Sequence, residues 1–268
     1  MPAHRKTRTS FVFNDGAFVA NSFPGNPVDV APVVLERDDL EAVVELLEKN
    51  RWRFESTKGR IIEDARANGI SSEVIEAFDK IPREKFVHPR LLEFAYFDCP
   101  LPIVGHEQPK LYEQRLSKPS YLLKVLNWLQ LSSTDRVLQL YTGIGYTTAL
   151  LSKISGEVVT IDPMEKFVKE AGRVLHELGI TNVTLSRLKD RLGYPQKAPY
   201  DRILVTSTVP EVPNGLLSQL QDGGKMIIPV VDNLKTRLEE FAKEPLPQQS
   251  LYRLIKNRGS TTEYLGSC

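Results

Sequence analysis

The first half of the chain shows apolar residues at helical spacing. Residues 37–52 combine such a stripe with acidic residues early and basic residues late, a pattern that predicts an amphipathic helix aligned with its dipole. A second helix is predicted over 57–69, and a third begins at the serine pair 71–72, either of which can cap it. Pro82 ends this third helix. Residues 1 to about 35 mix Gly, Pro, Asn and Asp with scattered aromatics and are expected to form an irregular arm.

From Ser132 onward the pattern changes to strands that alternate with helices. Alternation at this spacing predicts a parallel sheet covered on both faces. The expected fold class is therefore α/β, a Rossmann-like, doubly wound and mostly parallel sheet with an N-terminal helical extension. The predicted strands are 136–141, 157–162, 182–187, 200–207 and 224–231, and the predicted helices are 146–154, 164–179 and 212–220.

Composition narrows the class of protein. The 268 residues carry a formal net charge of +1, so no overall field favours nucleic acid or an acidic membrane surface as a partner. Cys99 and Cys268 are too few for a disulfide framework, which favours a reduced, cytoplasmic setting. No apolar run approaches the roughly 20 residues that span a bilayer. We expect a cytoplasmic protein with neither a nucleic-acid nor a membrane partner.

A glycine-containing turn follows the first strand of the alternating region. In an open parallel sheet, ligands bind beyond the carboxyl ends of the strands, where Gly143 and Gly145 let backbone amides approach them. Asp162 ends the next predicted strand and could accept hydrogen bonds from both ribose hydroxyls of an adenine nucleoside. It could equally cap the helix that follows, and the two roles are compatible. Asp190 follows the third strand and is either an acceptor for a purine amine or a solvated loop acid.

Other chemistries find little support in the sequence. The four histidines show no metal-binding spacing, so no metal site is predicted. Neither a GxxxxGK[ST] phosphate loop nor a GxSxG nucleophile elbow is present. Among the histidines, His106 lies in a polar stretch near the expected pocket and is kept as a candidate substrate-binding residue.

Five stretches between about Ile75 and Val231 carry a family resemblance. They are "IPREKFV" (81–87), "AYFDCPLPI" (95–103), "LSKPS" (116–120), "VLQLYTGIGYTTALLS" (137–152) and "APYDRILVTSTVPEVPNGLLSQLQDGGKMIIPV" (198–230). Through them the chain resembles the protein-L-isoaspartate (D-aspartate) O-methyltransferases. The resemblance implies a class I S-adenosylmethionine-dependent methyltransferase fold and S-adenosyl-L-methionine as cofactor. It also implies a protein or peptide carboxylate as acceptor, esterified at damaged aspartyl residues to start their repair.

The resemblance also implies roles for particular residues. Ser117 matches the family's active-site serine, which lies beside the transferred methyl group and the substrate carboxylate; a helix cap before Pro119 is its alternative role. Arg115 and Lys118 flank it and could bind a carboxylate, or form a solvated basic loop. Gly143 and Gly145 match the family's cofactor-loop glycines, Asp162 its ribose-binding acid and Asp190 its adenine-side acid. Gln139, Tyr141 and Thr142 stand at further positions of the same cofactor motif and are also candidate cofactor-binding residues.

Departures from the family pattern leave the acceptor open. The family usually has Glu at Gln139 and Gly at Tyr141, and its Gly-Asp-Gly around the adenine acid is Lys-Asp-Arg at 189–191. The segment before Ser117 is longer than in the family. The Tyr141 ring could fill the pocket or pack over the sulfonium of the cofactor. Three hypotheses follow: an isoaspartyl carboxyl methyltransferase, a same-fold enzyme acting on another modified peptide or a small molecule, and a non-catalytic binding or scaffold protein.

These interpretations divide the chain into three expected parts. Residues 1–56 form the N-terminal arm and helix, and residues 57–130 form a helical lead-in with a substrate-side loop. Residues 131–268 form the Rossmann-like cofactor-binding domain.

Overall fold

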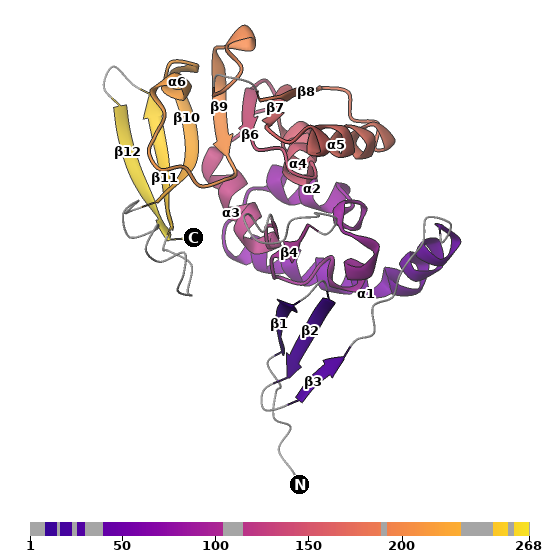
Figure 1. Cartoon of the computed structure of the whole chain (residues 1–268). Helices are drawn as coiled ribbons and strands as arrows, with labels where there is room; N and C mark the ends of the chain where they lie inside the picture. The colour runs from indigo at the N-terminus through magenta and orange to yellow at the C-terminus, as the bar shows by residue number, and fades with distance from the viewer. Residues whose placement is uncertain are drawn as a thin grey trace. The chain divides into compact units, whose positions relative to one another are not determined.

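The structure is a computed structural model and falls into two compact units, Met1–Lys49 and Asn50–Cys268 (Figure 1). Each unit is described by itself. The described residues are 9–14, 17–22, 26–29, 40–103, 115–188, 192–231, 249–256 and 260–267.

The first unit contains a three-stranded antiparallel sheet of β1 (Thr9–Asn14), β2 (Ala17–Ser22) and β3 (Asn26–Asp29). The expectation of an irregular arm is therefore wrong for these segments. The first two strands are rich in Phe and Val, which favour extended backbone. Asn14 pairs with Ala17, and the two residues between them in the sequence are Asp-Gly, the dipeptide most typical of a tight hairpin.

A single helix, α1 (Leu40–Ala67), replaces the two helices predicted over 37–52 and 57–69. The prediction of a break was wrong because no proline separates the two stretches, and Gly59 costs a helix interior only about 1 kcal/mol. Phe54, Ile61 and Ala65 are buried at helical spacing. The predicted end is confirmed, since Gly69 follows the helix with φ +72°.

Short helices connect α1 to the sheet. Helix α2 (Ser72–Lys80) has Ser71 at its N-cap position and ends at Ile81, before Pro82, as the sequence predicted. The 3₁₀ turns η1 (Arg83–Phe86) and η2 (Pro89–Phe94) follow, and β4 (Leu101–Pro102) pairs with β5 (Arg115–Leu116) ahead of α3 (Pro119–Leu129).

The second unit is built on a seven-stranded sheet of order β12-β11-β10-β9-β6-β7-β8 (Figure 1). Five neighbouring strands, β10, β9, β6, β7 and β8, are parallel. At one edge β11 pairs antiparallel with β10 and β12 pairs antiparallel with β11, and the sequence patterns did not predict these two strands. The mostly parallel α/β class is thus confirmed. The strands are β6 (Arg136–Leu140), β7 (Glu157–Asp162), β8 (Val183–Arg187), β9 (Tyr200–Val205), β10 (Leu220–Val231), β11 (Gln249–Lys256) and β12 (Ser260–Ser267).

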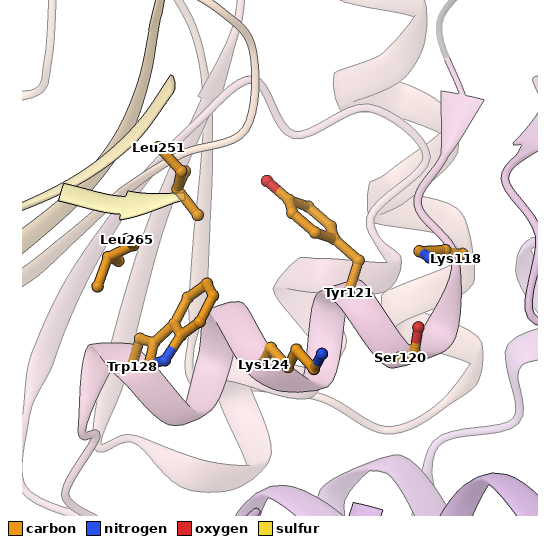
Figure 2. Close-up of a pocket in the computed structure, with 7 residues that line it drawn as sticks. All are labelled: Lys118, Ser120, Tyr121, Lys124, Trp128, Leu251 and Leu265. Atoms are coloured by element: carbon orange, nitrogen blue, oxygen red, sulfur yellow. The ribbon is translucent and has the colours of Figure 1, made fainter. Parts of the chain in front are cut away.

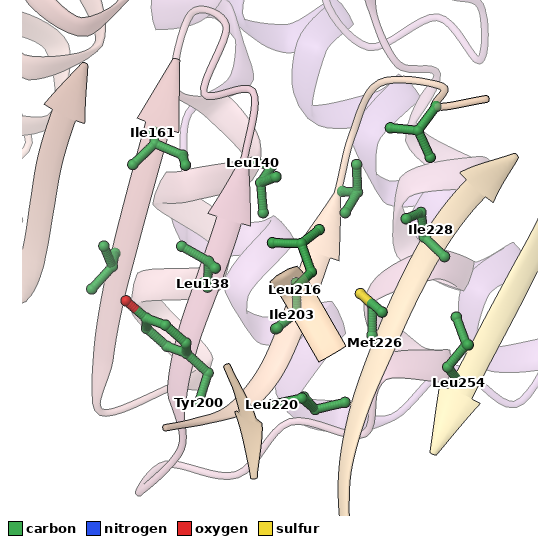
Figure 3. Packing of buried hydrophobic residues seen from close by; sticks show 13 residues of the cluster. Leu138, Leu140, Ile161, Tyr200, Ile203, Leu216, Leu220, Met226, Ile228 and Leu254 are labelled. Carbon is green, nitrogen blue, oxygen red and sulfur yellow. The ribbon is translucent and has the colours of Figure 1, made fainter. Parts of the chain in front are cut away.

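Helices cover both faces of this sheet. Successive side chains of a strand point to opposite faces, so Leu138 and Leu140 of β6 share one face and Gln139 lies on the other. The first face carries a hydrophobic cluster that includes Leu216 of α6 (Asn214–Leu217) (Figure 3). Gln139 accepts a hydrogen bond from Thr148 of α4 (Tyr146–Ile154), which places α4 on the opposite face. Helix α5 (Glu165–Glu177) packs on β7 and β8.

The direction of strand addition reverses between β6 and β9. The chain runs from β6 outward to β7 and β8, then crosses back to β9 on the other side of β6. The Thr206 hydroxyl, just beyond β9, donates to the carbonyl oxygens of Leu140 at 2.9 Å and Tyr141 at 2.6 Å. This switch point is where an open α/β sheet offers a ligand crevice, and the glycine-containing turn lies at it.

A helix that crosses a bilayer must be about 20 residues long and mostly apolar, and the helices of the described residues were examined for both properties. None of them is both long enough and apolar enough to cross a bilayer.

Candidate functional site

The turn after β6, residues 141–145, is called the glycine loop here. Its backbone enters the left-handed region three times, at Tyr141 (φ +67°), Gly143 (φ +53°) and Gly145 (φ +89°). Glycine adopts this region freely, whereas a tyrosine is strained in it. Tyr141 therefore occupies a position whose backbone conformation favours glycine.

Asp162, the last residue of β7, holds the loop in place. Its side chain is 1% exposed, and its two carboxylate oxygens accept hydrogen bonds from the backbone N–H of Gly143 at 3.0 Å and of Met164 at 2.8 Å. Burial raises the pKa of this carboxyl group, while the backbone N–H groups act in the opposite direction. Asp162 thus holds both the glycine loop and Met164, the residue before α5. Met164 occupies the N-cap position of α5, so the alternative role of Asp162 as the cap of that helix is wrong.

The two loop glycines have different surroundings. A Cβ atom added at Gly145 would lie 2.9 Å from the Cβ of Ala171, because α4 and α5 approach closely there. A Cβ added at Gly143 would have no atom within 4 Å other than its immediate chain neighbours. Gly145 is therefore required for packing, and Gly143 leaves an open space beside the backbone.

The other predicted cofactor residues of β6 and the loop turn inward. Gln139 is buried, accepting from the Thr148 hydroxyl at 2.8 Å and donating to the carbonyl of Tyr141 at 3.4 Å. Thr142 is also buried, and its hydroxyl hydrogen-bonds that of Thr160 at 2.7 Å. Both side chains thus form hydrogen bonds inside the protein that stabilise the glycine loop.

The Tyr141 side chain is half-buried and packs against the hydrophobic cluster of the sheet. Burial, and secondarily the charge of Asp162, raises the pKa of its phenol. The ring does not come within 4 Å of the Cβ position of Gly143. The space beside Gly143 is therefore not filled by this ring.

On the predicted acceptor side, Ser117 is half-buried and lies between β5 and α3. Lys118 occupies the N-cap position of α3, so the alternative role of Ser117 as the helix cap is wrong. The cap is supplied from outside the helix, since Asp98 accepts from the backbone N–H of Ser120 at 2.8 Å and from its hydroxyl at 2.7 Å. The Ser117 hydroxyl is thus not used as the cap of α3.

Arg115 and Lys118, the two predicted carboxylate-binding residues, are both exposed. Lys118 lines a cavity of about 170 Å³ between the outer side of α3 and the antiparallel edge of the sheet (Figure 2). No residue of the glycine loop lines this cavity. Its walls are Lys118, Ser120, Tyr121, Lys124, Trp128, Leu251 and Leu265.

Three residues near the loop were not singled out from the sequence. The ring of Phe86 packs on that of Tyr146, with centroids 5.3 Å apart, directly after Gly145. Arg83 is completely buried, and its guanidinium carbon lies 5.1 Å from the centroid of the same Tyr146 ring. The segment "IPREKFV" carries two of these residues, but a buried arginine gives no periodic signal in a sequence.

Two predicted site residues lie outside the described residues. His106 belongs to 104–114 and Asp190 to 189–191, and their roles stay predictions.

The arrangement suits an adenosyl group. A carboxylate at the end of the second strand, backbone amides in left-handed turns and open space beside Gly143 meet at the switch point of a parallel sheet. These are the elements that bind the ribose and the adjoining chain of a nucleoside cofactor.

Comparison with known proteins extends this picture. Residues 56–256 match the family model of protein-L-isoaspartate(D-aspartate) O-methyltransferase. A protein-L-isoaspartate O-methyltransferase of Cereibacter sphaeroides is 36% identical over 212 residues, covering 76% of this chain and 94% of the relative. Protein-L-isoaspartate O-methyltransferase 2 of Pelobacter propionicus is 41% identical over 157 residues, covering 59% of this chain and 67% of the relative.

Solved structures agree with the sequence matches. A protein-L-isoaspartate O-methyltransferase superposes with a TM-score of 0.67 at 27% identity, covering 79% of this chain, which spans 64% of the length of that protein. A putative Plasmodium falciparum enzyme of the same kind, in complex with S-adenosyl-L-homocysteine, gives a TM-score of 0.62 at 20% identity, covering 78% and 94%. The extent of the family match and the identity to relatives over most of their length show that this chain belongs to the protein-L-isoaspartate (D-aspartate) O-methyltransferase family.

Proposed function

We propose that this protein transfers a methyl group from S-adenosyl-L-methionine to the carboxylate of L-isoaspartyl residues in peptides or proteins. The observation that carries the proposal is the Asp162 carboxylate bound to the Gly143 backbone at the switch point of the sheet. Membership of the family supports the acceptor class. The two-cysteine composition supports a cytoplasmic location.

S-adenosylmethionine, when bound, supplies a methyl group activated by its sulfonium sulfur. In our proposal the chain holds it through Asp162 at the ribose, through Asp190 at the adenine, and with the space beside Gly143 open for the adjoining chain. Both Asp162 oxygens already accept one backbone N–H each, and each oxygen can accept a second donor. The carboxylate is thus oriented before a ligand arrives.

Ser117 orients the acceptor in this proposal. The nucleophile is already an ionised carboxylate, so the reaction requires alignment and exclusion of water more than a strong base. A hydroxyl group can donate one hydrogen bond to the carboxylate and hold it in line. The absence of Ser117 from the α3 cap leaves its hydroxyl available for that contact. Exposed Arg115 and Lys118, and His106, are proposed to bind the acceptor peptide near its carboxylate.

Tyr141 is proposed to border the cofactor pocket without closing it. The open Cβ position of Gly143 and the packing of the Tyr141 ring on the hydrophobic cluster support this view. The proposal also keeps the three-part division, with 1–56 as arm and helix, 57–130 on the acceptor side and 131–268 on the cofactor side.

Two measurements test the function. Calorimetric titration with S-adenosylmethionine should give saturable binding, which a non-catalytic scaffold with a closed pocket would lack. Transfer of radiolabelled methyl groups should then occur to a peptide with L-isoaspartate and not to the same peptide with normal aspartate. Binding without transfer to the isoaspartyl peptide would contradict the proposed acceptor.

A further inference from the structure

Arg83 is a buried arginine without a carboxylate partner among the described residues. Its side chain is 0% exposed. Its Nε donates to the carbonyl of Ala95 at 2.6 Å and its Nη2 to the carbonyl of Ser117 at 2.8 Å. The titratable groups that act on it are the phenols of Tyr146 and Tyr96 and the thiol of Cys99, whose raised pKa values keep them neutral at physiological pH. Because arginine keeps its proton in proteins, a full positive charge is buried here.

By distance and angle the hydrogen bonding of this guanidinium is incomplete, although the neighbouring Tyr146 phenol favours its charged form. In the described part of the chain, the buried side-chain polar atoms without a hydrogen-bond partner are Nη1 of Arg83 and the hydroxyl of Tyr146. The two belong to neighbouring groups, since the guanidinium carbon lies 5.1 Å from the Tyr146 ring centroid. Carbonyl dipoles and the ring face stabilise the cation in part. Within the described residues no carboxylate pairs with it directly, since the neighbouring Glu84 carboxylate accepts from the Tyr96 hydroxyl instead.

Arg83 contacts both the segment at Ser117, on the proposed acceptor side, and the helix that follows the glycine loop, on the proposed cofactor side. One arm of Arg83 binds the main chain at Ser117. Its guanidinium carbon lies over the ring of Tyr146, the first residue after the glycine loop. A buried charge left without a counter-charge is strongly destabilising. A fold that retains such a charge next to both segments gains when an anion binds between them.

We propose that Arg83 is the positioning residue of the acceptor site: it holds the Ser117 main chain, and its unbalanced charge favours binding of the acceptor carboxylate. This inference rests on the proposed function, because the carboxylate is the acceptor named there. It acts through Ser117 and through the field of the cation, and requires no direct contact with substrate.

The sign of the effect follows from the charges. The acceptor is an anion before transfer and a neutral ester afterwards. A nearby cation therefore stabilises the bound acceptor more than the product. Loss of the charge should raise KM for the peptide and weaken its binding, with a smaller change in kcat, whereas loss of structure would lower both activity and cofactor binding.

A double-mutant cycle tests the inference by binding alone. A fluorescent peptide with L-isoaspartate is titrated by anisotropy in saturating S-adenosylhomocysteine, alongside the same peptide with the isoaspartyl carboxylate converted to an amide. Wild-type protein should prefer the carboxylate peptide. Arg83→Met should bind the carboxylate peptide about tenfold more weakly, the loss expected for one partly screened charge, and the amide peptide about as well as wild type does.

Two further variants keep the test decisive. Arg83→Lys retains the charge and should recover most of the carboxylate preference; Arg83→Gln replaces Arg83→Met if the latter does not fold. The matched control is Arg202→Met, since Arg202 is also largely buried and binds the carbonyl of Leu129 at 2.9 Å, but it lies at the opposite end of the strands. This control should lose stability without losing the carboxylate preference.

Three results would overturn the inference. If folded Arg83→Met keeps the wild-type preference for the carboxylate peptide over the amide peptide, the charge of Arg83 has no effect on acceptor binding. If Arg83→Met binds both peptides and S-adenosylhomocysteine equally more weakly, Arg83 has a purely structural role. Failure of wild-type protein to bind or methylate the isoaspartyl peptide overturns the proposed function itself and is recognised before any variant is measured.

Discussion

The carboxylate of Asp162 accepts a hydrogen bond from the backbone N–H of Gly143 at 3.0 Å across 19 positions of sequence. The contact joins the end of β7 to the turn that leaves β6. It fixes the loop in a left-handed conformation at Gly143 that leaves one side of the backbone open. The same acid also accepts from the backbone N–H of Met164, the residue before α5. One side chain thus holds the turns that follow both β6 and β7.

Substitution of this acid should affect ligand affinity strongly. We expect Asp162→Ala to weaken S-adenosylhomocysteine binding at least roughly tenfold, since a hydrogen bond to a charged group contributes about 1.5–3 kcal/mol. Calorimetric titration measures this. The control is Asp201→Ala, because Asp201 accepts from the backbone N–H of Arg136 at 2.8 Å at the opposite end of β6. The control should lose stability and keep its affinity; equal affinity in both variants would refute the ribose assignment.

Alanine substitutions at the two loop glycines should have different effects, one mainly on the free energy of unfolding and the other mainly on ligand affinity. Gly145→Ala places a methyl group 2.9 Å from the Cβ of Ala171 at φ +89°, and we expect a loss of about 2–4 kcal/mol in the free energy of unfolding. Gly143→Ala meets no atom within 4 Å and should lose only about 1–2 kcal/mol, from backbone strain. Its methyl group should instead reduce S-adenosylhomocysteine affinity. Urea unfolding and calorimetry test the pair, and similar unfolding energies would contradict the packing argument.

Substitutions of Tyr141 test what this ring, which replaces the family's usual glycine, does in the proposed cofactor pocket. A ring over the sulfonium would contribute about 0.5–2 kcal/mol to S-adenosylmethionine binding and nothing comparable to S-adenosylhomocysteine, which lacks that charge. We expect Tyr141→Leu to reduce the preference for the charged ligand several-fold, and Tyr141→Phe to retain it. Tighter binding of both ligands by Tyr141→Gly would show that the ring fills the pocket instead.

The buried position of Asp162 predicts a pH dependence. Burial raises its pKa above the ordinary value of 3.8, so the folded protein protonates this group at a higher pH than the unfolded chain does. Protonation removes acceptor capacity, and S-adenosylhomocysteine affinity should fall as the pH decreases through the raised pKa. Relative to Asp162→Asn, the wild-type free energy of unfolding should fall as the pH rises through the same interval. Parallel pH profiles of the two proteins would argue against this assignment.

Local sequence patterns predicted most of the parallel sheet. The helix over 146–154 and the strand over 157–162 have the predicted bounds, because each is a short apolar segment between clear turn signals. The hairpin of β1 and β2 was missed, since the Asp-Gly signal stood among other turn-forming residues. The edge strands β11 and β12 were missed because they follow the region in which strands alternate with helices, and β12 has only Tyr264 and Leu265 as apolar residues.

The sequence by itself determined the fold class, the family resemblance and the positions of the loop glycines and Asp162, because these depend on local periodicity and short spacing. Tertiary structure decided what the side chains do. Gln139 and Thr142 form buried hydrogen bonds beneath the loop, Asp98 rather than Ser117 caps α3, and Arg83 is buried against the Tyr146 ring with its Nη1 atom unpartnered. Burial and long-range hydrogen bonds arise only when distant segments pack together, and no spacing along the chain encodes them.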